Sequence, residues 1–134
     1  MLFRSEVTMS VKYIIVPHKI PSKPDQPPTY YPRLKSIGEI NLREIAEDIA
    51  KGSTVSPGDT MAVIESLLQK VPDYLARGYI VRLGELGSFY LSIQAEGSDS
   101  SEQVNATKIK RNKLHFRAGK IVKQMLKHLD YRKA

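Results

Sequence analysis

The chain has 134 residues, of which 21 are Lys or Arg and 14 are Asp or Glu, and it contains neither Cys nor Trp. Because it has no thiol, it cannot form disulfides, thiolate zinc sites or cysteine nucleophiles. No apolar run approaches the roughly 18–20 residues of a membrane span, and the first residues lack the basic and apolar regions of a signal peptide. We therefore expect a small, soluble, cytoplasmic protein with no membrane contact.

The positive charge is distributed unevenly along the chain. Residues 1–38 have a net charge of +4, residues 39–103 of −6 and residues 104–134 of +9. Such segregation favours a polyanionic partner, which could be DNA, RNA or an anionic membrane surface. The alternative is that the basic residues only form a solvated face that keeps the protein soluble.

The N-terminal quarter combines a strand with a proline-rich segment. Residues 11–16 are mostly β-branched or aromatic, which predicts a short strand. Six of the eight prolines lie between Pro17 and Pro32, and this stretch can form neither a helix nor a central strand because proline lacks an amide donor. We interpret it as an extended connector, with a ligand for a proline-binding domain as the alternative. Met9 could be an alternative start, with residues 1–8 as a dispensable leader.

Two helices are predicted in the middle of the chain. Asn41 and Ser56 are suited to cap the N-termini of helices. Apolar residues then recur at helical spacing over residues 42–49 and 61–75, and each run ends near a glycine. Pro72 lies within the second run and is expected to kink it. The two helices should form a hairpin whose apolar stripes build a core.

After the second helix the hydrophobic period changes to that of strands. Alternating residues over 79–83 and 89–93, joined by a glycine-bearing turn at 83–88, predict a β-hairpin. Residues 95–102 are a polar and acidic excursion, and residues 107–116 are a third extended segment. The order of helices and strands therefore predicts an α+β fold.

The last predicted element is a basic amphipathic helix that begins at about Ala118 and Gly119. Its apolar and basic residues fall on opposite faces. The apolar set is Val122, Met125, Leu126 and Leu129, and the basic set is Lys120, Lys123 and Lys127. The basic surface continues back along the preceding strand through Lys108, Lys110, Arg111, Lys113 and Arg117. A basic surface that spans strand and helix predicts contact with phosphates.

Two short motifs in this order of elements resemble the HU/IHF family of bacterial DNA-binding proteins. Residues 83–89, Leu-Gly-Glu-Leu-Gly-Ser-Phe, are similar to the family's strand, glycine turn and Phe after the second helix. Residues 116–120, Phe-Arg-Ala-Gly-Lys, are similar to the segment entering its last helix, with Ala118 where proline is usual. The resemblance covers about residues 39–130, and residues 11–36 fit a variant branch with an N-terminal addition.

The resemblance implies how the molecule is organised. Residues 1–36 would be an N-terminal extension with a short strand and a Pro-rich connector, and residues 37–134 the DNA-binding domain. In that domain a helical hairpin would form the base, with a three-stranded antiparallel sheet, a β-arm and the C-terminal helix, in an intertwined homodimer. A shared core suits the sequence because three short strands and two helices bury little apolar surface alone. The candidates for this dimer core are Leu68, Val81, Phe89, Leu91 and Phe116.

The predicted arm departs from the family's pattern. In minor-groove architectural proteins, of which HU and IHF are examples, an apolar wedge inserts between base steps. Here no proline follows Pro72, and the predicted tip contains Glu96, Asp99 and Glu102. Because carboxylates repel phosphates, we do not extend the resemblance to intercalation or strong bending.

The predicted DNA contacts have two origins. The resemblance implies phosphate contacts by Arg117, Lys120 and Lys123. Charge and spacing alone predict Lys108, Lys110, Arg111, Lys113 and Lys127. None of these residues is expected to read bases, because lysines on a helix and a strand contact the backbone.

Two functions remain open from the sequence. The first is largely sequence-independent binding of double-stranded DNA by a homodimer, as in a nucleoid-associated architectural protein. The second is an HU-derived structural or protein-interaction module with weak or lost DNA binding, which the acidic tip and the added strand favour. We expect no enzymatic activity, metal, cofactor or small-molecule substrate. His18, His115 and His128 lack metal-ligand spacing, and neither a GxSxG elbow nor a phosphate-binding loop is present.

Overall fold

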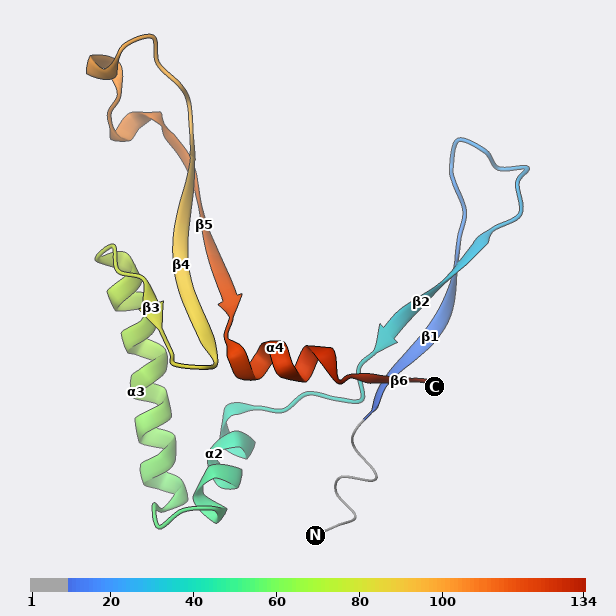
Figure 1. The fold of residues 1–134 in the computed structure, drawn as a ribbon, viewed down its shortest axis with the longest axis horizontal. Helices are drawn as coiled ribbons and strands as arrows, with labels where there is room; N and C mark the ends of the chain where they lie inside the picture. The colour runs from blue at the N-terminus through green and yellow to red at the C-terminus, as the bar shows by residue number, and fades with distance from the viewer. Residues whose placement is uncertain (1–9) are drawn as a thin grey trace. The chain divides into compact units, whose positions relative to one another are not determined.

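The structure is a computed structural model that describes residues 10–134 (Figure 1). The expectations about a signal peptide, a leader and a start at Met9 concern residues outside the described ones. The chain divides into two compact units. The second unit is Asn41–Gln124, and the first combines the described residues up to Ile40 with Met125–Ala134. The expected division into residues 1–36 and 37–134 stays a prediction.

The second unit begins with the predicted helical hairpin. Its helices are α2 (Leu42–Lys51) and α3 (Pro57–Ala76). The side chain of Asn41 accepts the amide N–H of Glu44 at 2.9 Å, and the hydroxyl of Ser56 accepts that of Asp59 at 3.1 Å. Both predicted N-caps are therefore confirmed. Helix α3 continues through Pro72 to its end.

The second unit also contains an antiparallel sheet with strand order β3–β4–β5. Its strands are β3 (Val81–Arg82), β4 (Gly87–Ala95) and β5 (Ile109–Ala118). Strands β4 and β5 extend as a long two-stranded arm (Figure 1). The polar excursion at its tip contains two short 3-10 helices, η1 (Ser101–Gln103) and η2 (Ala106–Lys108). The predicted hairpin is confirmed, although β3 is shorter than expected.

Few apolar side chains are buried in the described part of the chain. Ala46, Ala50 and Leu75 are buried, but no large side chain is fully enclosed. Of the residues predicted for a dimer core, Val81 and Phe89 are half-buried. The other three are exposed: Leu68 by 52%, Leu91 by 48% and Phe116 by 47%. The apolar surface predicted to form a core thus stays largely accessible in the single chain.

The first unit contains a second sheet, with strand order β2–β1–β6. Its strands are β1 (Ser10–His18), β2 (Thr29–Lys35) and β6 (Asp130–Lys133). Strand β1 pairs antiparallel with β2 and parallel with β6. The sequence predicted the first of these strands but neither of its partners. The expected connector is therefore partly a strand, and Pro32 is tolerated because β2 lies at the sheet edge.

Helix α4 (Lys120–Lys127) begins directly after Gly119, close to its predicted start. It ends two residues before Leu129, so that residue does not belong to the apolar helix face that the sequence predicted. None of the helices formed by the described residues has the length and hydropathy needed to cross a membrane. The combination of helices with two sheets confirms the predicted α+β class.

Candidate nucleic-acid interface

The two motifs singled out in the sequence lie against each other at the start of α4. The amide N–H of Gly119 donates to the carbonyl oxygen of Leu86 at 2.8 Å, and that of Ile121 donates to Glu85 at 3.2 Å. A Cβ atom on Gly119 would overlap the carbonyl group of Glu85. Glycine is therefore required at this position. The two hydrogen bonds also satisfy amide donors that a helix N-terminus leaves without partners.

The β3–β4–β5 sheet has one basic face and one apolar face. Successive side chains of a strand point to opposite faces, so residues paired across strands share a face. The side that carries the Arg and Lys residues is called the basic face. Its pairs are Arg82–Ser88, Ser88–Arg117, Tyr90–His115, Ser92–Lys113 and Gln94–Arg111. The apolar face has the pairs Val81–Phe89, Phe89–Phe116 and Leu91–Leu114. One sheet thus separates a surface for anions from a surface for packing.

Side-chain contacts order the middle of the basic face. The hydroxyl of Ser92 and Nε2 of His115 are 2.6 Å apart, within hydrogen-bond distance. The ring of Tyr90 stacks on that of His115, with centroids 5.0 Å apart and an interplanar angle of 15°. These contacts link β4 to β5 and hold flat rings between the cations at either end of the face.

A shallow hollow of about 240 Å³ lies at one end of the basic face. Its lining residues are Ile80, Arg82, Ser88, Tyr90 and Arg117. Nη1 of Arg82 lies 3.5 Å from the hydroxyl of Ser88, which places a guanidinium group beside a hydroxyl group. Guanidinium groups bind phosphate oxygens through parallel N–H donors. The hollow can therefore take a phosphate group.

Three of the predicted DNA-contact residues lie on the basic face and two on the adjoining helix. Arg111, Lys113 and Arg117 come from β5, and Lys120 and Lys123 from α4. All five side chains are exposed. No carboxylate among the described residues forms an ion pair with them or with Arg82. These six cations are thus available to an anionic partner.

The other three predicted residues lie further from the basic face. Lys108 ends η2 at the arm tip, and Nζ of Lys110 lies 3.6 Å from the carboxylate of Glu96. Lys127 is the last residue of α4, one turn after Lys123 on the same side of the helix. The ion pair with Glu96 partly neutralises Lys110, so we expect that lysine to contribute less than its neighbours on the basic face.

Arg82 was missed by the sequence analysis as a member of the site. It alternates with Val81 and Leu83 in a strand pattern, which indicated an outward side chain. Its place on the same face as Arg117, with Ser88 between them, became visible only through the register of β3, β4 and β5. His115, which lacks metal-ligand spacing in the sequence, lies in the middle of the basic face.

Comparisons with known proteins relate the chain to HU-domain proteins. The profile of a family described as HU-HIG, an HU domain fused to wHTH, Ig or a glycine-rich motif, matches residues 9–133. A crystal structure from Bacteroides vulgatus, of a protein whose proposed role is bacterial DNA binding, has a TM-score of 0.61 and 17% identity. The match covers 95% of this chain and 49% of that one, so this chain spans about half its length. No curated protein matches the sequence.

Proposed function

The chain belongs to the HU-HIG family, and on that premise we propose that it binds double-stranded DNA as a homodimer, through phosphates and with little sequence preference. The observation that carries the proposal is the basic face, where Arg82, Arg111, Lys113 and Arg117 lie on one side of one sheet. Flexible cations that contact phosphates give affinity without sequence information. The role is architectural and non-catalytic, and it would associate the protein with the nucleoid.

The charges of the basic face determine how binding depends on salt. Each phosphate neutralised by Lys or Arg releases counterions from the duplex. If about eight basic residues of a dimer contact phosphates, log K falls against log salt with a slope of about −7. Arg82 and Arg117 are expected to matter most, because they flank the hollow and can each donate two parallel hydrogen bonds.

The apolar face supports the dimer. Phe89 and Phe116 pair across β4 and β5 with ring centroids 5.0 Å apart, yet Phe116 remains half exposed. Leu91 and Leu114 extend the same face along the arm and are also exposed. Covering these side chains with a second copy would gain about 25 cal/mol for each Å² of apolar surface removed from water. A monomer would leave this surface in solvent.

The arm tip limits what the dimer does to the duplex. Glu96, Asp99 and Glu102 place carboxylates at the tip, and no proline is present there to insert between base pairs. We therefore propose binding without sharp kinking, because wedge insertion is the route by which minor-groove proteins unstack base steps. The same carboxylates favour the second candidate function, a protein-interaction module with weak or lost DNA binding.

The experiment that tests the proposal removes the two guanidinium groups at the hollow. A labelled duplex is titrated with wild type and with Arg82→Ala/Arg117→Ala, and binding is followed by fluorescence anisotropy. We expect the double variant to bind at least tenfold more weakly. The control is Arg43→Ala/Lys70→Ala, which removes the same charge from exposed positions of α2 and α3. Equal affinity of wild type and both variants would assign binding elsewhere, and absence of wild-type binding at low salt would favour the interaction module.

A further inference from the structure

The sheet of the first unit has a face rich in tyrosine. The register of β2, β1 and β6 places on one side the pairs Tyr13–Leu34, Ile15–Pro32, Pro17–Tyr30 and Val11–Tyr131. We call this the aromatic face. Three of the chain's seven tyrosines therefore lie on one face of a sheet of three short strands.

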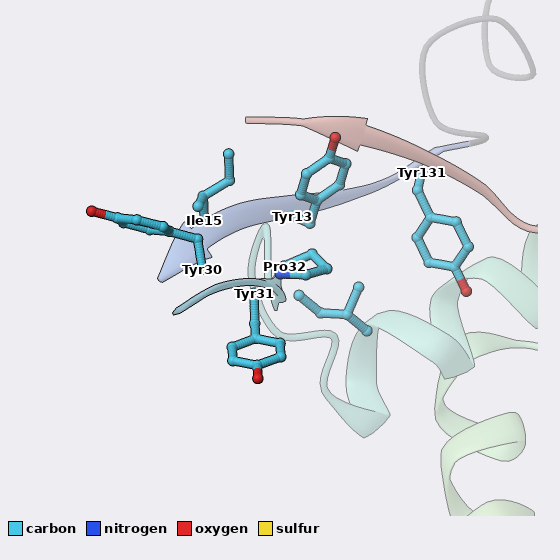
Figure 2. Close-up of a pocket in the computed structure, with 7 residues that line it drawn as sticks. Tyr13, Ile15, Tyr30, Tyr31, Pro32 and Tyr131 are labelled. Carbon is cyan, nitrogen blue, oxygen red and sulfur yellow. The ribbon is translucent and has the colours of Figure 1, made fainter. Parts of the chain in front are cut away.

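The aromatic face is open. A cavity of about 580 Å³ is lined by Tyr13, Tyr30 and Tyr131 together with Leu34 and Pro32. Figure 2 shows the three tyrosines of the face around it. Tyr30 is 64% exposed and Tyr131 57%. Tyr31 also contributes to the cavity lining, but its ring extends to the other side of β2 from Pro32 and makes an edge contact with His18 (Figure 2). The rings of Tyr30 and Tyr131 are thus accessible to a ligand, and Tyr13 on the sheet's central strand is half-buried.

The unit that carries the aromatic face is basic. The described residues of the first unit include eight basic and three acidic residues, a net charge of +5. Lys133 is paired with Tyr13 on the aromatic face itself. Arg33 on β2 pairs with Ile14, and both Lys35 on β2 and Arg132 on β6 pair with Lys12, so these three cations lie on the opposite face of the same sheet. No ion pair between described residues involves these four side chains.

We infer that the aromatic face binds single-stranded DNA, with bases stacked on Tyr13, Tyr30 and Tyr131 and the backbone attracted by Lys133 and by the net positive charge of the unit. Exposed aromatic rings on a sheet, combined with Lys and Arg, are the elements of sequence-tolerant single-strand binding. A duplex cannot use this surface in the same way, because its bases already stack on each other.

Charge favours single-stranded DNA over a second copy of the chain or a neutral peptide as the partner of the aromatic face. A second copy on the same face would bring two units of net charge +5 together, and like charges oppose such a contact. A neutral apolar peptide would leave the cations without partners, whereas a polyanion uses both the rings and the charges. The choice of DNA as the polymer rests on the proposed function. Because both units belong to one chain, a duplex bound by one raises the concentration of its unpaired stretches near the other.

The test uses the full chain and a labelled oligo(dT) of about 12 nucleotides, within the site sizes of about 4–16 nucleotides known for such platforms. We expect binding to quench tyrosine fluorescence, which is observable because the chain has no Trp. Tyr30→Ala/Tyr131→Ala should weaken binding at least tenfold, whereas Tyr30→Phe/Tyr131→Phe should keep it, because the rings remain. Tyr79→Ala is the matched control, since this residue is 60% exposed in the second unit.

The outcomes separate this inference from the proposed function. If Tyr30→Ala/Tyr131→Ala loses oligo(dT) but binds duplex as wild type does, the aromatic face is a second site. If Arg82→Ala/Arg117→Ala loses duplex and keeps oligo(dT), the two sites are independent. Unchanged oligo(dT) binding by the Ala variant would overturn the inference, as would tighter binding of the matching RNA. Loss of self-association by that variant without a change in oligo(dT) binding would identify a dimer contact instead and would also overturn it.

Discussion

The two sheets of this chain have three strands each but differ in how they are assembled and in what they expose. In β3–β4–β5, each strand pairs with its neighbour in sequence, and the faces are basic on one side and apolar on the other. In β2–β1–β6, the first described strand pairs with the last, and one face is rich in tyrosine and includes Lys133. The difference suits two kinds of contact within one chain: the basic face of β3–β4–β5 is suited to phosphates, and the aromatic face of β2–β1–β6 is suited to bases.

The largest expected effect concerns the apolar face of the β3–β4–β5 sheet. In the proposed dimer this face is buried, whereas the β2–β1–β6 sheet stays open. Phe116→Ala should lower the free energy of unfolding by about 4 kcal/mol, because truncating a packed Phe costs about 3–5 kcal/mol. Chemical denaturation at several protein concentrations measures this, and a stable dimer also makes Tm rise with concentration. Tyr131→Ala, in the other sheet, should change stability by less than about 1 kcal/mol. A similar small loss in both variants would contradict a buried apolar face.

The second prediction tests whether the basic face depends on the contact between the two motifs. Gly119→Ala should cost about 3 kcal/mol, because the new Cβ would overlap the backbone of Glu85, which cannot move as a side chain can. Thermal unfolding and duplex titration should both report the loss. At Gly97 a Cβ meets nothing within 4 Å, so Gly97→Ala should stay within about 0.5 kcal/mol of wild type. Equal stability of the two variants would show that the close approach is not required.

The smallest expected effect concerns two lysines of the same strand. Lys113 lies on the basic face, whereas Lys110 lies beside Glu96. Lys113→Gln should make the salt slope of duplex binding shallower by about 2 per dimer, one for each lost phosphate contact. Lys110→Gln should change the slope less, because its ammonium group is already partly neutralised. Anisotropy titrations over a series of salt concentrations measure the slopes of both variants. Equal changes of slope would contradict the assignment of duplex binding to the basic face.

The helices and the arm strands could be predicted from the sequence because their determinants are local. Asn41 and Ser56 mark the helix starts through side chains that reach only a few residues ahead. The change of hydrophobic period after α3 marks the strands of the arm. For the same reason, the predicted positions of Arg111, Lys113 and Arg117 on one strand were close to those in the structure.

The sheet of the first unit could not be predicted, because it depends on pairing between distant residues. Strand β6 comes from Asp-Tyr-Arg-Lys, a segment with no apolar alternation, and it is formed by hydrogen bonds to β1. Strand β2 contains Pro32, which argues against a strand unless its position at the edge is known. Arg82 could not be assigned to the site for a related reason, because only the register shows that it shares a face with Arg117.

The most direct test of duplex binding by the basic face is the salt dependence of wild-type affinity. Two labelled duplexes of unrelated sequence are titrated with protein at several salt concentrations, and log K is plotted against log salt. The account predicts similar affinities for both sequences and a slope of about −7. A slope near zero, or no binding even at low salt, would contradict it.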